Sequence, residues 1–168
     1  AGASSCIACA AGTYSVNSTE VACAACEAGS ITDKGTSSGA TVCTACAVGK
    51  YSMASSVAAC TDCTAGRYVG TTGSAAAGDC VVCEAGSITN KLASTGATTC
   101  AACAVGKYTT ASTEACTDCD VGKYAATDAS SACSACSAGK YQDTAGQGYC
   151  KVCLAGSRTD TGTSAGAS

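Results

Sequence analysis

The chain lacks several residue types altogether. Its 168 residues include no His, Trp, Phe or Pro and only one Met. Without His, histidine-dependent triads, His-ligated zinc and His-ligated haem are excluded. Leu, Ile and Val together number 16. These few large apolar side chains do not build a core that offsets the entropy of ordering the chain, so cross-links must hold it together.

Charge and hydrophobic runs exclude further classes. Nine basic and twelve acidic residues give a net charge of −3, which disfavours a nucleic-acid partner. No apolar run approaches the ~18 residues needed to span a bilayer, so we expect no membrane insertion by this segment. Residues 1–30 show no basic stretch followed by an apolar one, so no signal peptide is visible. If the protein is secreted, we expect this sequence to be a mature chain or an internal segment.

Cysteine spacing organises the sequence. Cysteine accounts for 18 of the 168 residues, a composition typical of disulfide scaffolds. Every cysteine belongs to a C-x-x-C motif. The motifs begin at residues 6, 23, 43, 60, 80, 100, 116, 133 and 150. The residues that follow each motif also repeat. They read x-x-Gly-Lys-Tyr after Cys46 and x-Ala-Gly-Ser-Ile-Thr after Cys83. The chain is therefore a tandem array, and we expect each module to contact mainly its neighbours.

Two chemistries fit C-x-x-C motifs at this spacing, namely four-cysteine zinc sites and disulfide bridges. Zinc sites take motifs in pairs, and nine motifs leave one over. Zinc modules of this kind commonly carry basic surfaces, whereas this chain is acidic. A redox C-x-x-C motif is expected once, within a βαβ unit. The sequence therefore favours disulfides and no cofactor, with an intracellular zinc array as the alternative.

Loop closure favours one disulfide connectivity. A bridge within a motif tethers nothing, whereas a bridge from the second Cys of one motif to the first Cys of the next encloses an arm. Each such loop of ~15 residues stabilises the fold by ~3 kcal/mol. The expected bridges are Cys9–Cys23, Cys26–Cys43, Cys46–Cys60, Cys63–Cys80, Cys83–Cys100, Cys103–Cys116, Cys119–Cys133 and Cys136–Cys150. Cys6 and Cys153 are left over, and we expect each to pair with a neighbouring copy.

The same boundaries define the modules of one continuous array over residues 1–168. The arms are 9–23, 26–43, 46–60, 63–80, 83–100, 103–116, 119–133 and 136–150, with an incomplete arm at 153–168. Each arm begins with a Gly turn and a β-prone pair such as Tyr-Thr or Ile-Thr, followed by turn residues such as Asp33–Thr36. No apolar period of 3.6 residues is present. We therefore expect a small, disulfide-rich, mostly irregular fold with short β-hairpins and almost no helix, arranged as an elongated tandem-repeat rod.

The segment Gly139–Cys153 resembles a known repeat. It reads GKYQDTAGQGYCKVC and is similar to the ephrin-receptor-like, tumour-necrosis-factor-receptor-like cysteine-rich repeat, whose pattern is C-P-x-G-x-Y, a polar turn and C-x-x-C. The other modules match more loosely, and together they cover nearly the whole chain. The resemblance implies an extracellular disulfide ladder with Tyr rings packed against the bridges, and it supports the connectivity above. The family's Pro is Ala or another residue here, which fits a protist (ciliate or algal) surface or filament protein better than a receptor.

Three further features are candidate sites or assembly signals. Asn17-Ser18-Thr19 is an N-glycosylation sequon, and the Ser/Thr-rich arms are candidates for O-glycans. One basic residue occupies an equivalent position in five modules, namely Lys50, Arg67, Lys107, Lys123 and Lys140. This residue acts either as an exposed edge charge that discourages strand pairing or as part of a cationic stripe for an acidic glycan or neighbouring copy. Ala165–Ser168 repeats Ala1–Ser4, as expected for one period of a longer polymer.

No catalytic constellation is present in the sequence. The carboxylates are scattered over the arms, and no phosphate loop, nucleophile elbow or calcium loop occurs, so we expect no enzyme. The favoured interpretation is an extracellular or cell-surface structural protein that is glycosylated and forms a filament, fibre or surface coat with copies of itself. The alternative is a receptor-like or adhesive surface-antigen ectodomain that binds a protein or glycan ligand. The only aromatics are the repeat tyrosines and Tyr149, which disfavours a ligand-binding hot spot.

Overall fold

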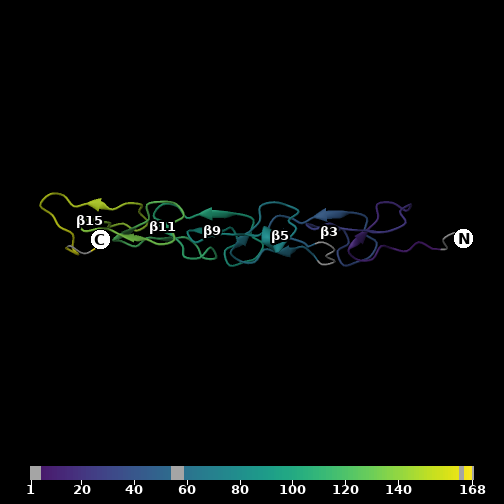
Figure 1. The fold of residues 1–168 in the computed structure, drawn as a ribbon. Helices are drawn as coiled ribbons and strands as arrows, with labels where there is room; N and C mark the ends of the chain where they lie inside the picture. Colours follow the sequence, from purple (N-terminus) through teal and green to yellow (C-terminus); the bar gives the residue numbers. More distant parts are fainter. Residues whose placement is uncertain (1–4, 54–58, 163–164, 168) are drawn as a thin grey trace. The chain divides into compact units, whose positions relative to one another are not determined.

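The structure is a computed structural model that describes residues 5–53, 59–162 and 165–167 (Figure 1). The chain forms two compact units. One comprises Ala1–Val81 with Thr95–Thr98, and the other comprises Val82–Ser94 with Thr99–Ser168. The sequence repeat between the two ends involves residues 1–4 and 168, which lie outside the described residues.

Short strands make up nearly all of the regular structure. They are β1 (Thr13–Tyr14), β2 (Ala24–Ala25), β3 (Ser30–Thr32), β4 (Cys43–Ala45), β5 (Lys50–Tyr51), β6 (Thr61–Asp62), β7 (Arg67–Tyr68), β8 (Val81–Val82), β9 (Ser87–Thr89), β10 (Cys100–Ala102), β11 (Lys107–Tyr108), β12 (Thr117–Asp118), β13 (Lys123–Tyr124), β14 (Ser134–Ala135), β15 (Lys140–Tyr141) and β16 (Lys151–Val152). One 3₁₀ helix, η1 (Ala77–Asp79), is the only helix among the described residues. None of the helical structure seen there is long and apolar enough to cross a bilayer.

Within the described residues, the strands pair in chain order, β1 with β2, β3 with β4 and so on, which gives eight two-stranded sheets. The first strand of a pair follows the Gly turn, and the second lies between the two cysteines of the next motif. In the β5–β6 hairpin, Lys50 is opposite Asp62 and Tyr51 is opposite Thr61. Tyr and Thr favour this extended backbone, and the turn before β5 ends at Gly49 with a φ of +80°. The repeated sequence thus specifies one hairpin per arm.

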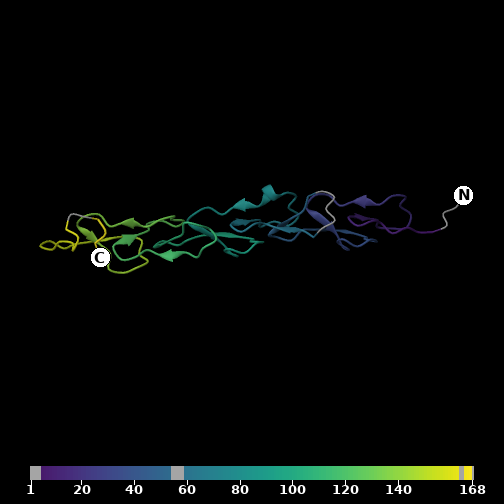
Figure 2. The ribbon, with the colours of Figure 1, turned by 90° about the horizontal axis from the view of Figure 1, so that it is seen from below.

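Backbone hydrogen bonds join each module to the next. In the first unit, the N–H of Ser52 donates to the carbonyl of Ser74 over 3.0 Å, and the N–H of Gly73 donates to the carbonyl of Cys46 over 2.8 Å. The equivalent pair of bonds recurs in the second unit. Within each unit the hairpins follow one another in chain order (Figure 2). Because these bonds use main-chain groups, they tolerate wide variation in the side chains between cysteines.

Besides the contacts between adjacent modules, some contacts reach the second module along the chain. A Cβ added to Gly106 would lie 2.0 Å from the carbonyl oxygen of Gly146, which belongs to the second module after it. Gly49 has the same relation to Gly96 in the first unit, at 2.4 Å. Such distances are possible only for a residue without a side chain. The feature of the sequence that permits this approach is the Gly three residues after the second Cys of every C-x-x-C motif.

Bridges and small side chains form the interior. The Cys that opens each bridged arm is buried. The residue after the Tyr or Ile of the first strand is also buried in every bridged arm but the first, where Ser15 is half-buried; in the others it is Thr, Ser, Val, Ala or Gln. The repeat tyrosines are half-buried, and Tyr51 packs against the cluster of Cys63, Val69 and Cys80, as the family resemblance implied. The prediction of a small disulfide-rich fold of short hairpins with almost no helix is confirmed.

Candidate functional site

Eight disulfide bridges form the chemical framework of the chain. The structure contains Cys9–Cys23, Cys26–Cys43, Cys46–Cys60, Cys63–Cys80, Cys83–Cys100, Cys103–Cys116, Cys119–Cys133 and Cys136–Cys150. Their Cα–Cα distances are 5.6–5.8 Å, as is usual for disulfides. This is the connectivity that loop closure favoured. Within the described part of the chain, no group of three or more His, Cys, Asp or Glu side chains is placed to hold a metal ion.

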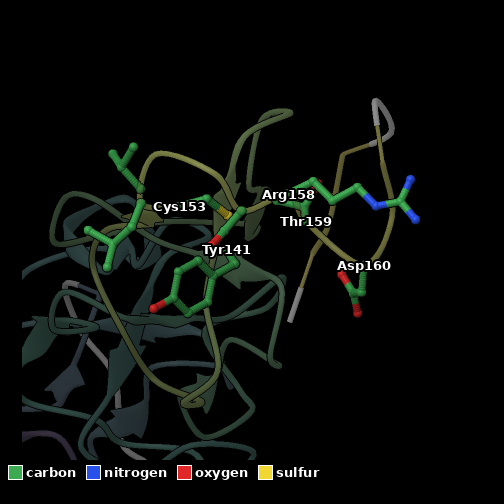
Figure 3. A pocket seen from close by; sticks show the side chains of 8 residues that line it. Tyr141, Cys153, Arg158, Thr159 and Asp160 are labelled. Carbon is green, nitrogen blue, oxygen red and sulfur yellow. The ribbon is translucent and has the colours of Figure 1, made fainter.

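Cys6 and Cys153 form no bridge within these 168 residues. Cys6 is exposed and Cys153 is half-buried. Cys153 lines a cavity of about 400 Å³, which also contacts Tyr141, Val152, Leu154, Ser157, Arg158, Thr159 and Asp160. Figure 3 shows Tyr141 and Cys153 close together, with Arg158 and Asp160 on the segment beyond them. This thiol is therefore accessible from a hollow rather than sealed in the interior.

The basic residue of the repeat is used inside its own hairpin in two modules of the same subtype. The Lys50 ammonium donates to Asp62 over 2.6 Å, and Lys107 donates to Asp118 over 2.6 Å. Each Lys is directly opposite its Asp in the strand register. The partners are 41–52% exposed, so each pair adds little to stability.

The other basic positions differ from one module to the next. An Arg67 guanidinium N–H donates to the carbonyl of Cys80 over 2.9 Å. Lys123 and Lys140 are exposed, and the residues opposite them in the register are Ala135 and Val152. The five positions therefore do not form a uniform cationic stripe.

A third ion pair lies in the last complete arm, and the module pattern did not reveal it. Lys151 donates a hydrogen bond to Asp143, and its Nζ lies 5.7 Å from the centroid of the Tyr141 ring. The hydrogen bond from Lys151 lowers the pKa of the Asp143 carboxyl below its ordinary value of 3.8. The same bond raises the pKa of Lys151 above 10.5. Sequence reasoning missed the pair because Asp143 lies in the variable arm and not opposite the Lys in a strand.

The sequon lies at the exposed turn of the first arm. Asn17 is exposed, and its side-chain oxygen accepts hydrogen bonds from the N–H of Thr19 over 3.0 Å and from the Thr19 hydroxyl over 2.6 Å. These bonds engage the amide oxygen and not the amide nitrogen, which is the atom that carries an N-linked sugar. The geometry therefore leaves the acceptor nitrogen on an exposed residue.

Comparison with known proteins gives the family. The family described as tyrosine-protein kinase ephrin type A/B receptor-like matches residues 1–41 and 122–168, just over half of the chain. The chain belongs to this family. No curated protein matches the chain. The ephrin-receptor-like repeat is a receptor-type extracellular domain that is not itself catalytic. Together with a ladder of eight bridges, which requires an oxidising compartment, this places the chain outside the cell or at its surface.

Proposed function

We propose that this ephrin-receptor-like chain is an extracellular structural protein that builds a filament, fibre or surface coat from copies of itself. The observation that supports this most is that the repeated groups of the array serve its own cohesion. Main-chain groups of successive modules bond to one another, the repeat tyrosines are half-buried, and Lys50 and Lys107 pair within their hairpins. Because these groups already serve contacts within the array, they suit a structural protein and leave few side chains that could anchor a ligand.

We also propose that the assembled protein carries covalent glycans, with Asn17 as an N-linked site. The support is the exposed turn and the two hydrogen bonds from Thr19 to the Asn17 side chain. Treatment of native protein with peptide-N-glycosidase should convert Asn17 to Asp in the recovered peptide. An unmodified Asn17 peptide at full occupancy, in material from the secretory pathway, would contradict this site.

Immunogold electron microscopy of source cells, combined with extraction, tests the structural role. Antibody against the chain should label an extracellular fibre or coat in a regular pattern. The labelled material should resist detergent and become soluble when a reductant is added, because disulfides hold it together. Labelling of dispersed, detergent-soluble molecules on the cell surface would overturn the structural role.

One observation favours the alternative of a receptor-like or adhesive ectodomain. Tyr149 is 60% exposed, the most exposed Tyr of the described residues. It lines a cavity of about 330 Å³ together with Tyr124 and Lys140. If the chain is an adhesin, Tyr149→Ala should abolish attachment of cells to the immobilised protein, whereas Val16→Ala, an exposed apolar position elsewhere, should not.

A further inference from the structure

Two pockets are lined by equivalent positions of different modules. One has a volume of about 310 Å³ and lies in the first unit, and the other has a volume of about 330 Å³ and lies in the second unit. In each pocket, one module contributes its repeat Tyr. The next module contributes the residue after its opening Cys, its basic residue, the Gly two positions before its closing Cys, and that closing Cys. These residues are Tyr51, Thr64, Arg67, Gly78 and Cys80 in the Arg67 pocket, and Tyr124, Ser137, Lys140, Gly148 and Cys150 in the Lys140 pocket.

Each pocket combines an aromatic ring, a hydroxyl and a cation. Tyr51 and Tyr124 are half-buried, so the packing of the array holds their rings in place. The cations are on the exposed side of each pocket. In the Lys140 pocket, Tyr149 adds a second ring that is 60% exposed. Because the same five positions meet in both units, the pocket is a product of the repeat and not of one irregular arm.

The cations of both pockets carry charge that nothing nearby neutralises. No ion pair of Arg67 or Lys140 is seen among the described residues, and the described lining of both pockets contains no Asp or Glu. The Arg67 guanidinium donates one of its five N–H groups to the carbonyl of Cys80, which holds it at the pocket wall. Asp79 follows the pocket Gly in the sequence, but its carboxylate accepts hydrogen bonds from two backbone N–H groups of its own arm, over 2.7 and 3.0 Å. Each pocket is therefore suited to an anion.

A third pair of modules has the Tyr and the cation without the rest of the set. Tyr108 is followed in the next module by Lys123, but the residue after the opening Cys is Asp120 and the residue two positions before the closing Cys is Ser131. A carboxylate thus occupies the position where the two pockets have a hydroxyl, and a carboxylate repels an anion. The chain therefore contains its own comparison for the two pockets.

The lining favours a ligand that has a ring as well as a negative charge. Arg and Lys bind carboxylates through charge-assisted hydrogen bonds. The Tyr ring offers a flat apolar face, and the hydroxyl of Thr or Ser both donates and accepts. A uronic acid has the complementary groups, namely a carboxylate, an apolar C–H face and a rim of hydroxyls. The pocket volumes are at the lower end of the range for small-ligand sites, as suits a single sugar ring. An acidic peptide side chain matches the cation but has no ring to cover the Tyr.

We propose that the Arg67 pocket and the Lys140 pocket bind uronic acid residues of an acidic polysaccharide. The carboxylate pairs with the cation, the C–H face of the sugar lies on the Tyr ring, and a sugar hydroxyl bonds to Thr64 or Ser137. An exposed cation makes each site weak on its own. A polymer with repeated uronic acids occupies more than one site at a time, which raises its apparent affinity. This role adds a polysaccharide to the proposed coat and does not depend on the coat being formed.

The first test titrates the purified, disulfide-intact full chain with trigalacturonate and follows the Tyr ring signals by NMR. The signals of Tyr51 and Tyr124 should shift, and those of Tyr108 should not. The methyl ester of trigalacturonate has the same rings without the charge, so it should bind about tenfold more weakly or worse. Equal shifts at Tyr108 and Tyr51, or equal binding of the ester, would overturn the proposal.

Removal of the two cations tests their role. The variant with both Arg67→Gln and Lys140→Gln should bind trigalacturonate about tenfold more weakly or worse, because the charge-assisted hydrogen bonds are lost. Lys123→Gln is the matched control at the third pair of modules and should leave the affinity unchanged. All three side chains are exposed, so the variants should keep the fold. Equal affinities of the double variant and the control would overturn the sites.

An added carboxylate tests the position of the hydroxyl. Thr64→Asp introduces the charge that Asp120 has in the third pair of modules, so the Tyr51 signals should no longer shift. Thr71→Asp makes the same substitution at an exposed position of the same arm that does not line the pocket, and should leave the shift unchanged. The same result for both variants would show that net charge, and not the pocket, governs binding, and would overturn the proposal.

Two further polymers separate the classes of ligand. Polygalacturonate should bind about tenfold more tightly than dextran sulfate or poly-glutamate at the same ionic strength, because only it offers a carboxylate on a sugar ring. Equal binding of dextran sulfate would indicate a general attraction for polyanions, and equal binding of poly-glutamate would indicate a site for acidic peptides. Either result would overturn the proposal. Immunogold labelling of a coat is independent of all these titrations, so the pockets and the structural role can fail separately.

Discussion

At the scale of single residues, the interior consists of disulfide bridges and small side chains. A single buried aliphatic residue therefore contributes a large share of the free energy of unfolding. Val69 is 6% exposed and packs with Cys63 and Cys80. We expect Val69→Ala to lower the free energy of unfolding by about 2 kcal/mol, because two buried methyl groups are lost. Thermal unfolding of the disulfide-intact protein measures this. Val16→Ala, at a position 62% exposed, should change stability by less than ~0.5 kcal/mol, and equal effects would contradict the burial of Val69.

The repeated Gly makes a second prediction at this scale. Gly106→Ala should cost at least ~3 kcal/mol, because Ala is strained at a φ of +84° and its Cβ meets the backbone of Gly146. Gly35→Ala carries the backbone strain alone and should cost ~1 kcal/mol. Gly78→Ala, with no positive φ and open space, should be nearly neutral. Denaturant unfolding of the three variants should preserve this order, and a cost at Gly106 no larger than at Gly35 would contradict close packing between modules.

At the scale of the element, the last complete hairpin, β15–β16, has an electrostatic link to its own arm. Because the pKa of Asp143 is lowered in the fold, its contribution to stability is present above pH 3.8 and is lost as the pH falls through the lowered value. Because the pKa of Lys151 is raised, its contribution is present below pH 10.5 and is lost as the pH rises through the raised value. We therefore expect protection of the β15–β16 amides, followed by NMR hydrogen exchange, to be greatest between these limits.

A double-mutant cycle isolates this contribution. When protection of the β15–β16 amides is plotted against pH, its loss at low pH forms the acid limb of the profile. Asp143→Asn and Lys151→Gln should each make this loss smaller, and the double variant should reduce it no further than either single variant. The β11–β12 hairpin has its own pair, Lys107 and Asp118, and should behave as in the unmodified protein in all three variants. An acid limb that survives in Asp143→Asn would show that another carboxylate causes it.

At the scale of the whole molecule, the features that could be predicted from the sequence are those that repeat in every module. The Cys spacing and the Gly-Lys-Tyr motif predicted the hairpins, because the strand, the turn and the bridge all lie within one arm. The approach of Gly106 to Gly146 was not predictable in this way, since it depends on the path of the backbone through the intervening module. Nor was the link from Asp143 to Lys151, because the variable arms carry no repeated signal. The repeated motifs therefore predict the structure of a single module, whereas the contacts between modules become visible only in the three-dimensional structure.

The contacts between modules predict which amides of the second unit lose hydrogen-exchange protection when one bridge is removed. Replacing Cys119 and Cys133 with Ser opens a loop with a sequence separation of 14, which should cost ~3 kcal/mol locally. The opened arm carries Ala129, whose carbonyl packs on Gly86 two modules earlier. We therefore expect the Gly86 amide, which donates to Thr109 over 2.8 Å, to lose hydrogen-exchange protection.

The Gly106 amide serves as the nearest-neighbour reference in the same experiment, because it donates to Ala125 inside the opened arm over 2.9 Å. An array coupled only between adjacent modules would lose protection at Gly106 and keep it at Gly86, which would contradict coupling over two modules. The matched control replaces Cys9 and Cys23, a bridge of the same sequence separation in the first unit, and should leave the Gly86 amide protected. Loss of protection at both glycines in the first variant and at neither in the control is the outcome expected of modules that are each held by the next two.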